Sequence, residues 1–348
     1  MEKKWMQAAV MPEIGKIVME KKLIPAIKEN EVLVKIKHVG ICGSDLHYFE
    51  RGRIGNFIVE KPIILGHESA GEIVEKGASV TTLKLGDLVT LEPGIPCGAC
   101  HYCKTGRYNL CPDVVFMATP PYDGAFVEYI AYPANMAFKL PVGMGTIEGA
   151  LIEPLAVGFH AAGQAGAKIG QSAAVLGCGC IGLVTMMTLQ AMGVTKIYMV
   201  DLIEKRLEKA RQLGATLAIK ADETDTIQAI LAATEGEGVD MVFETAGSTI
   251  ATQQTVELVK RGGTIVLVGI VAEALVPYDV GALISKEASI HTVFRYRNLY
   301  PAAIQAVAAG RIPLKEIVTH TFMFQEIEKA LQYNSQNKKD IVKAVIQF

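Results

Sequence analysis

Hydrophobic and polar positions alternate with a period of two along the first part of the chain. Short alternations of this kind, broken by Gly, Pro and Asp, are typical of antiparallel β-strands. They predict strands over residues 31–38, 71–75, 88–91 and 125–131, and an apolar first strand over residues 5–11. We therefore expect a mainly antiparallel β domain at the start of the chain.

The rhythm changes near residue 155, where short apolar strands begin to alternate with helical segments. The strands are predicted over residues 173–176, 196–200, 217–219, 241–243 and 264–268, and helices over residues 181–192, 203–213, 227–233 and 251–259. Such alternation predicts an α/β fold, a Rossmann-type doubly wound parallel sheet with helices on both faces.

This rhythm stops near His291, and the tail carries a predicted helix over residues 302–309 and a strand over residues 341–346. We expect the tail to rejoin the β domain. The predicted domains are therefore residues 1–155 with 293–348, and residues 156–292.

Composition narrows the class of protein. The 348 residues are 50% hydrophobic and 20% charged, with a formal net charge of −2. This balance argues against partners held by bulk charge, such as nucleic acids or anionic membranes. The longest stretch without a charged side chain, from Ile169 to Thr195, is long enough to span a bilayer. Its clustered glycines fit a strand, a tight turn and a buried helix better, so we predict no membrane span.

Four of the seven cysteines are spaced C-x2-C-x2-C-x7-C within a proline-punctuated loop. They are Cys97, Cys100, Cys103 and Cys111. Such spacing brings thiolates together around one ion, and a tetrahedral structural zinc is the interpretation we favour. An iron–sulfur cluster, free thiols and disulfides are the alternatives. A disulfide framework would need an oxidising compartment, which nothing else in the sequence indicates.

A glycine motif, G-x-G-x-x-G, occupies Gly177, Gly179 and Gly182, between a predicted strand and a predicted helix. The next predicted strand ends at Asp201, at the spacing expected for a dinucleotide site. The glycines let a pyrophosphate approach the backbone, and the carboxylate accepts hydrogen bonds from a ribose. A 2′-phosphate would be repelled there, which favours NAD over NADP, although Arg206 tempers this preference because an arginine nearby can bind the extra phosphate.

A second constellation combines Cys42, the motif Gly66-His67-Glu68, and Glu153. A thiolate, an imidazole and a carboxylate would leave a fourth position open, which is the arrangement of catalytic zinc. Each residue alone could equally belong to the core. The combination makes a catalytic metal site the better interpretation, with Glu68 and Glu153 as alternative carboxylate ligands.

These motifs together resemble the zinc-dependent medium-chain alcohol dehydrogenase family, and within it the sorbitol (L-iditol) and xylitol dehydrogenases. The zinc signature lies at 66–80, the cysteine lobe at 97–111 and the nucleotide motif at 177–182. The polyol subgroup is indicated by segments at 42–48, 52–57, 118–121, 151–155 and 293–296. The resemblance implies a GroES-like catalytic domain beside the Rossmann domain, and two zinc ions per subunit.

The resemblance also implies roles for individual residues. Cys42, His67 and Glu68 would hold the catalytic zinc, with Glu153 on the metal's water or the substrate. Ser44 and His47 would relay the proton. The substrate pocket would be lined by Tyr48, Phe116, Glu153, Arg295 and Tyr296. The cofactor would contact Gly177, Gly179, Ile181, Gly182, Asp201, Arg206, Gly269, Ile270, Phe294 and Arg295. Cys178 and Cys180 receive no catalytic role.

The resulting hypothesis is zinc- and NAD-dependent oxidation of a polyol's secondary alcohol to the ketose by a cytoplasmic homotetramer. The alternatives are dehydrogenases of galactitol, butanediol or threonine, or a crystallin-like protein that binds the cofactor without catalysis. Such a storage protein would be expected to have a broken metal site, whereas all the ligands are present here.

Overall fold

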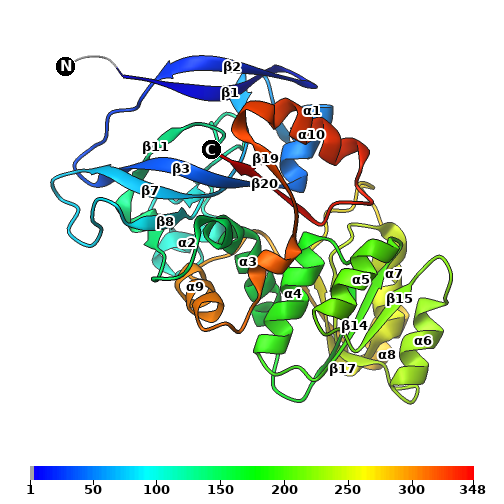
Figure 1. Cartoon of the computed structure of the whole chain (residues 1–348). Helices are drawn as coiled ribbons and strands as arrows, with labels where there is room; N and C mark the ends of the chain where they lie inside the picture. Colours follow the sequence, from blue (N-terminus) through cyan, green and yellow to red (C-terminus); the bar gives the residue numbers. More distant parts are fainter. Residues whose placement is uncertain (1–3) are drawn as a thin grey trace. The chain divides into compact units, whose positions relative to one another are not determined.

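The computed structural model describes residues 4–348 of the chain (Figure 1), which form two compact units. The first unit runs to Glu153 and takes up the chain again at 300–310 and 314–348. The second covers Pro154–Leu299 and Arg311–Pro313. Mainly antiparallel sheets in the first unit and a parallel sheet in the second confirm the predicted fold class.

The first unit is built on a seven-stranded sheet with the order β12-β8-β7-β3-β20-β19, in which β11 also pairs with β3. These strands are β3 (Glu31–Ile41), β7 (Glu68–Lys76), β8 (Leu88–Leu91), β11 (Tyr129–Pro133), β12 (Ala137–Lys139), β19 (Val318–Met323) and β20 (Lys343–Gln347). The C-terminal strand β20 therefore lies beside β3, from the start of the chain (Figure 1). Ile36, Ile73 and Leu91 are among the side chains that the sheet buries in the core.

Smaller elements surround this sheet. A three-stranded sheet joins β1 (Trp5–Glu13), β2 (Lys16–Leu23) and β6 (Ile63–Ile64), and a hairpin joins β4 (Arg53–Ile54) and β5 (Phe57–Ile58). Helices of this unit include α1 (Gly43–Arg51), α9 (Tyr300–Ala308) and α10 (Ile327–Gln336), with 3-10 turns η2 (Ala134–Met136), η3 (Leu314–Ile317) and η4 (Phe324–Glu326).

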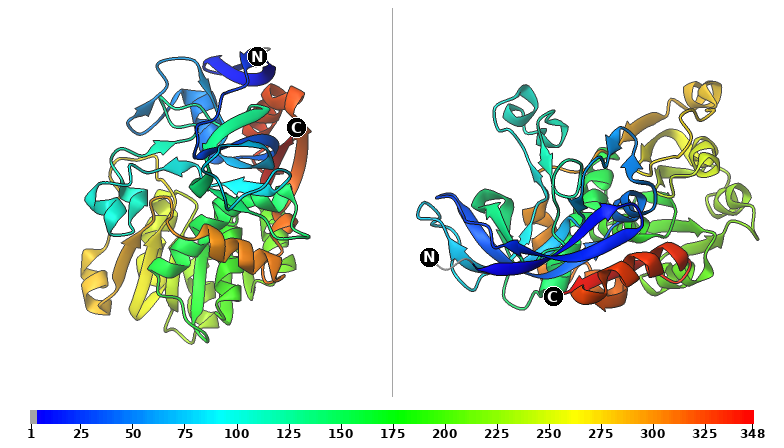
Figure 2. Two further views of the ribbon diagram at one scale, coloured as in Figure 1. Left: turned by 90° about the vertical axis from the view of Figure 1, so that its left-hand side faces the viewer. Right: turned by 90° about the horizontal axis from the view of Figure 1, so that it is seen from above.

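A lobe with the four predicted zinc cysteines projects from the first unit on a neck of two short strands (Figure 2). The neck pairs β9 (Gly94–Ile95) with β10 (Val115–Phe116). The lobe itself contains only α2 (His101–Lys104) and η1 (Tyr108–Leu110). So short a segment has little apolar core of its own, which is why such lobes depend on a bound ion.

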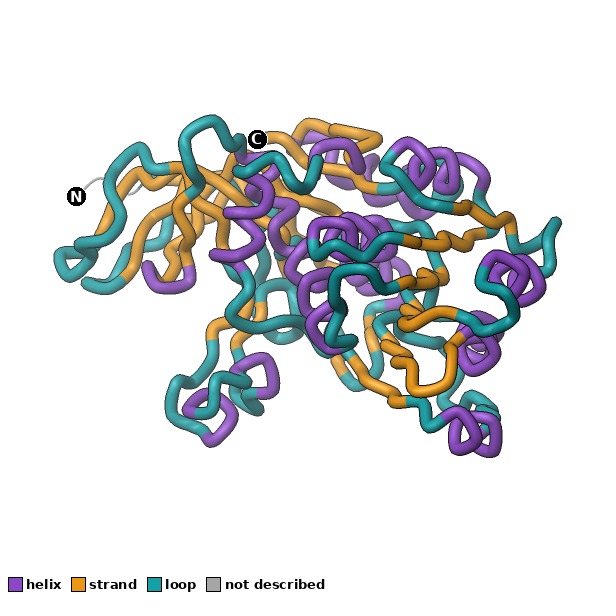
Figure 3. The backbone as a smooth tube through the Cα atoms, turned by 90° about the horizontal axis from the view of Figure 1, so that it is seen from below, coloured by secondary structure: helices purple, strands orange, loops and turns teal. Residues whose placement is uncertain are grey.

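The second unit is a six-stranded parallel sheet with the order β15-β14-β13-β16-β17-β18. Helices flank the strands of this unit (Figure 3). Its strands are β13 (Ser172–Leu176), β14 (Lys196–Asp201), β15 (Leu217–Lys220), β16 (Val239–Glu244), β17 (Val259–Leu267) and β18 (Ser289–Thr292). The helices that alternate with these strands are α4 (Cys180–Ala191), α5 (Glu204–Gln212), α6 (Thr226–Ala233), α7 (Thr249–Leu258) and α8 (Val280–Lys286). The order reverses between β13 and β16, as in doubly wound dinucleotide-binding folds.

Two local expectations were wrong. The strand predicted over 125–131 begins only at Tyr129, because the N–H groups of Ala125 and Phe126 bond instead to the carbonyl oxygens of Gly66 and Leu65, in the loop after β6. The chain around residue 155 is not β structure but the long helix α3 (Thr146–Gln164), which contains Pro154. The apolar residues of α3 show no helical periodicity, because the helix is buried on most of its faces. No described helix is long and apolar enough to cross a membrane.

Helix α3 provides a direct test of packing in the second unit. A Cβ added at Gly158 would lie 2.9 Å from the backbone of Val184 in α4. Overpacking of a rigid backbone contact costs roughly 1–3 kcal/mol, so Gly158→Ala should lower the melting temperature measured by calorimetry. Gly163→Ala in the same helix is the matched control. No atom lies within 4 Å of its added Cβ, so the better helix propensity of alanine should stabilise the protein by up to about 1 kcal/mol. Equal melting temperatures for the two variants would contradict this packing.

Candidate active site and metal centres

The pairing of β3 with β7 brings the candidate metal ligands to one end of the sheet. Gly40 on β3 lies opposite Glu68 on β7. Cys42 comes two residues beyond Gly40, and His67 comes immediately before Glu68, so the register places these side chains together. The ligand atoms of Cys42, His67 and Glu68 all lie within 4.8 Å of one another.

Gly40 shows how closely the cluster is built. A Cβ at this position would lie 2.0 Å from Oε2 of Glu68, so only glycine leaves room for the carboxylate. That Oε2 atom is buried, and Nζ of Lys343 lies 2.5 Å from it. Lys343 on the neighbouring strand β20 donates to Oε1 at 2.5 Å and to the carbonyl oxygen of Ile41 at 2.9 Å. The lysine and the carboxylate are both almost fully buried.

Asp45 holds the two ligand-bearing segments together. Its carboxylate accepts hydrogen bonds from the N–H of Cys42 and the N–H of Gly66, both at 2.9 Å. Cys42 is the N-cap of α1 and Asp45 its third residue, so the first bond also caps the helix. Oδ1 lies 3.9 Å from Nδ1 of His67. Asp45 is fully buried, and burial raises its pKa against the opposing effects of His67 and the two amides.

The electrostatics of this cluster favour a cation. Burial alone would lower the pKa of His67, but the thiolate of Cys42, which hydrogen-bonds to the ring, and the carboxylates of Asp45 and Glu153 raise it to about 10. Several negatively charged groups therefore surround the imidazole of His67. A thiolate, an imidazole and a buried carboxylate form a donor set that fits zinc.

Glu153 lies close enough for its charge to act on His67, but its carboxylate does not belong to the group of converging donor atoms. It lies on α3 and is 6% exposed. Of the two carboxylates that the sequence left open as ligands, Glu68 is the one that converges with Cys42 and His67. Phe116 also lies at this site, since its ring centroid is 5.8 Å from that of His67.

The remaining predicted site residues of the first unit lie on α1. Tyr48 is buried, Ser44 is half-buried and His47 is exposed. Partial desolvation and the charge of Arg51 lower the pKa of His47, which favours the neutral, proton-accepting imidazole at neutral pH.

The four cysteines of the lobe also converge. Their sulfur atoms lie within 4.8 Å of one another, and the Cys100–Cys103 and Cys97–Cys103 pairs are 3.5 and 3.9 Å apart. A tetrahedron with zinc–sulfur bonds of ~2.3 Å has edges of about 3.8 Å, so the arrangement fits zinc. None of the seven cysteines forms a disulfide, so the disulfide alternative does not hold. The N–H groups of Ala99 and Cys100 lower the pKa of Cys97 to about 7, which favours the thiolate.

In the second unit, the glycine motif forms the turn between β13 and α4. Gly177 has a φ of +109°, and a Cβ at Gly182 would lie 1.9 Å from the carbonyl oxygen of Gly177. Asp201 at the end of β14 accepts hydrogen bonds from the N–H of Cys178 at 2.6 Å and of Ile203 at 2.9 Å. Gly179 caps α4 without a side chain, which leaves the helix N-terminus open to an anion such as a pyrophosphate.

The other predicted cofactor and substrate residues of this unit surround the same sheet or follow it. Arg206 Nη1 is 4.0 Å from Asp201 and 3.9 Å from a Cβ built at Gly179. Ile181 is half-buried and Ile270 is exposed, and a Cβ at Gly269 would collide with the backbone of Gly247. After β18, Arg295 lies over the ring of Phe294 at 4.8 Å, and Tyr296 is buried.

Three buried residues near the candidate ligands escaped the sequence analysis: Asp45, Glu92 and Lys343. Burial and, to a smaller extent, the charge of Glu153 raise the pKa of Glu92 to about 7, against the opposing effect of the hydrogen bond from Tyr108. Asp45 carried a detectable signal, since an acid at the third position of a helix is a capping pattern. Nothing local marks Lys343, because its partner is 275 residues away in sequence.

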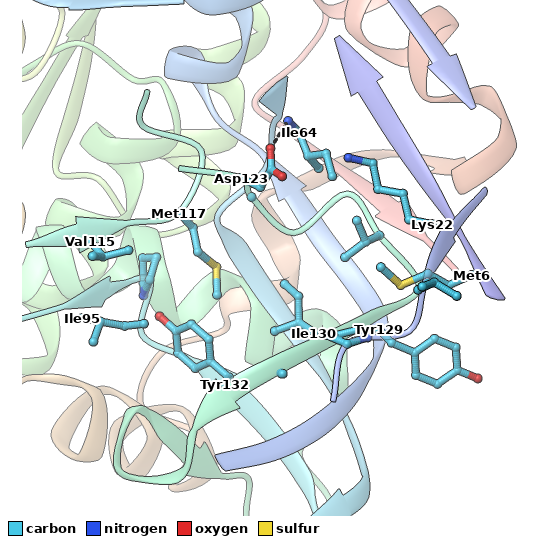
Figure 4. A pocket seen from close by; sticks show the side chains of 16 residues that line it. Met6, Lys22, Ile64, Ile95, Val115, Met117, Asp123, Tyr129, Ile130 and Tyr132 are labelled. Carbon is cyan, nitrogen blue, oxygen red and sulfur yellow. Dashed lines mark hydrogen bonds between the residues drawn. The ribbon is translucent and has the colours of Figure 1, made fainter. Parts of the chain in front are cut away.

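A separate cavity of about 350 Å³ in the first unit contains none of the predicted site residues (Figure 4). Its walls are mostly apolar and come from β1, β2, β11 and the neck of the cysteine lobe. Lys22 and Asp123 supply its charged groups.

Comparison with known proteins gives two family matches within the chain. Residues 28–142 match the alcohol dehydrogenase GroES-like domain family, and residues 180–309 match the zinc-binding dehydrogenase family. The two matches together cover more than half of the chain.

Individual relatives extend over almost the whole length. An uncharacterised zinc-type alcohol dehydrogenase-like protein of Escherichia coli is 48% identical over 93% of this chain and 94% of its own. Sorbitol dehydrogenase of Bacillus subtilis is 43% identical over 98% and 97%. Among solved structures, an Escherichia coli oxidoreductase of unknown specificity has a TM-score of 0.95 and 45% identity, with 99% of each chain covered.

The bridge made by Asp45 predicts a specific loss of stability. In Asp45→Asn an NH2 group replaces one of the two acceptor oxygens, so the N–H of either Cys42 or Gly66 loses its buried partner. This should cost about 1–3 kcal/mol, measured as a lower melting temperature. The control is Asp123→Asn, because the exposed Asp123 accepts one hydrogen bond, from Ile64, which the asparagine oxygen can retain. A melting temperature for Asp45→Asn as high as for the control would refute the bridge.

Proposed function

The chain belongs to the zinc-binding alcohol dehydrogenase family, and on this premise we propose that it oxidises a secondary alcohol of a polyol to the ketose with NAD as hydride acceptor. The observation that carries the proposal is the convergence of Cys42, His67 and Glu68 on one buried point. The 43% identity to a sorbitol dehydrogenase supports a polyol such as sorbitol or xylitol as substrate.

Two zinc ions per chain fit the residues. Cys42, His67 and Glu68 would hold the catalytic ion, and the four cysteines of the lobe would hold the structural one. A zinc ion at the catalytic position supplies Lewis acidity that lowers the pKa of an alcohol. Lys343 neutralises Glu68 in part and keeps its side chain directed at the cluster.

The chain's own residues would bind the polyol and move the proton. Glu153, buried beside His67, is suited to accept hydrogen bonds from a substrate hydroxyl. Phe116 and Tyr48 supply apolar wall, and Arg295 and Tyr296 are further candidates for substrate contacts. Ser44 and His47, three residues apart on α1, face the same side of the helix and can pass a proton outward. The lowered pKa of His47 prepares it to accept that proton.

Asp201 supports NAD as the cofactor. Its carboxylate closes the glycine turn through the N–H of Cys178 and stands where a dinucleotide's ribose hydroxyls would donate hydrogen bonds. A 2′-phosphate about 4 Å away would be repelled by a few kcal/mol at an effective dielectric constant near 20. Arg206 at 4.0 Å reduces this repulsion in part.

We also propose a homotetramer in the cytoplasm. The absence of disulfides among the seven cysteines favours a reducing compartment. Strand β18 is the edge strand of the parallel sheet, and its four residues are exposed, which leaves backbone groups available for pairing with a second copy.

The substitution Ile290→Pro tests assembly through this edge, because it would remove one of these N–H groups. Sedimentation velocity should then show smaller assemblies than wild type, and an unchanged tetramer would contradict assembly through this edge.

NADH formation across a panel of alcohols tests the proposed activity. Sorbitol or xylitol with NAD should give the highest kcat/KM, and NADP should give a lower one. Galactitol, butanediol and threonine are the competing substrates in the same assay. Turnover of threonine or butanediol without turnover of any polyol would overturn the substrate class. No turnover with any alcohol would favour a protein that binds the cofactor without catalysis.

Glu153→Ala should lower turnover at least about tenfold, because about 1.4 kcal/mol of transition-state stabilisation corresponds to that factor. Steady-state kinetics with the best polyol measure the effect. Glu148→Ala on the same helix is the control, because Glu148 pairs with Lys315 outside the cluster. Wild-type kinetics for Glu153→Ala would remove Glu153 from the site.

A further inference from the structure

Glu92 lies directly beside the candidate catalytic ligands. Leu91, the last residue of β8, pairs with Ser69 on β7. Continuing this register by one residue puts Glu92 opposite Glu68. Glu92 is only 3% exposed, and the charge of Glu153 acts on its carboxyl group. None of the roles proposed above uses this buried acid.

The side chain of Glu92 is bonded to the cysteine lobe. The hydroxyl group of Tyr108 donates to Oε1 of Glu92 at 2.6 Å. Tyr108 begins the turn η1, which leads directly into Cys111, and the N–H of Cys111 donates to the carbonyl oxygen of Tyr108 at 3.0 Å. The position of Tyr108 therefore depends on the segment that delivers the fourth cysteine.

The same part of the chain leads from the lobe back to His67. The neck begins just after Glu92, where Gly94 pairs with Phe116, and the N–H of Met117 donates to the carbonyl oxygen of Pro93 at 3.0 Å. Phe116 packs against His67 at 5.8 Å between ring centroids. A movement of the neck would therefore move an aromatic wall of the catalytic cluster.

The neck also borders a cavity. Ile95, Val115 and Met117 line the cavity of about 350 Å³ (Figure 4), and Met117 also belongs to the core of this unit, with Ile95 packed against that core. Tyr132, on another wall of that cavity, donates from its hydroxyl group to the backbone oxygen of Glu92 at 2.6 Å. Both the side chain and the backbone of Glu92 thus act as fixed points beside the neck.

We propose that Glu92 is a positioning residue that couples the two metal sites. Through Tyr108 it holds the cysteine lobe in place, and through the neck it holds Phe116 against His67, so that loss of order in the lobe loosens the Cys42–His67–Glu68 site. This inference rests on the proposed zinc function. The structural ion of the lobe would then determine how well the catalytic site retains its metal, and not only whether the lobe is ordered.

Zinc release to an excess of a chromophoric chelator tests the coupling on the full-length, zinc-loaded protein. Zinc release should have two kinetic phases, one for each site. The phase that Cys42→Ser lacks belongs to the catalytic zinc, and the phase that Cys103→Ser lacks belongs to the zinc of the lobe. Tyr108→Phe and Glu92→Ala should each accelerate the catalytic phase by about tenfold, as for other residues that support ligands indirectly. Glu92→Gln keeps an oxygen acceptor for the Tyr108 hydroxyl and should release catalytic zinc at nearly the wild-type rate.

Tyr102→Phe is the matched control, because it removes a hydroxyl group from an exposed tyrosine of the same lobe. It should leave both phases unchanged. In a double-mutant cycle, the effects of Tyr108→Phe and Glu92→Ala should not add, since both remove the same bond. Melting temperatures of all variants separate this effect from general destabilisation.

A catalytic phase in Tyr108→Phe as slow as in wild type would overturn the coupling while leaving the zinc function intact. Additive effects of the two substitutions, or a Glu92→Gln variant as fast as Glu92→Ala, would overturn it as well. A wild-type protein with no Cys42-dependent phase would instead contradict the proposed function, and this inference with it.

Discussion

The buried carboxylate of Asp45 joins the two segments on which the candidate catalytic cluster depends. One oxygen binds the N–H of Cys42 at the start of α1, and the other binds the N–H of Gly66 just before His67. The pairing of β3 with β7 brings these segments close, but strands end in loops that could diverge. The bridge fixes the loops, and the negative charge of Asp45 adds to that of Cys42 and Glu153 around one imidazole. Such a concentration of buried negative charge is costly unless a cation compensates it.

Much of the fold could be predicted from the hydrophobic pattern, because its period follows from the geometry of each element. The strand over 88–91 was predicted with its observed bounds, and the helix expected over 181–192 differs by one residue at each end. Helix α3 was missed because a helix buried on most sides shows no amphipathic period and also contains Pro154. The strand at 125–131 was predicted too long because its first residues alternate correctly yet bond to a loop.

Some residues of the site could be predicted from the sequence and others could not, and the difference has a physical reason. Cys42, His67 and the four lobe cysteines could be recognised because ligand chemistry restricts residue type and spacing. Lys343 and Glu92 act through contacts that only the folded chain creates: Lys343 reaches Glu68 from the last strand, and Glu92 reaches Tyr108 across the lobe. Spacing alone also left Glu68 and Glu153 as equal candidates, whereas the strand register directs Glu68 at the cluster and α3 sets Glu153 beside it.

Zinc dependence of polyol oxidation tests the central claim most directly. The measurement is NADH formation from the best polyol while zinc is added back to metal-depleted protein that retains its fold. If the cluster joined by Asp45 holds the catalytic ion, activity is absent without zinc and returns with it, and Cys42→Ser does not recover. Full activity in the metal-depleted protein, or recovery of Cys42→Ser to the wild-type rate, would contradict the account.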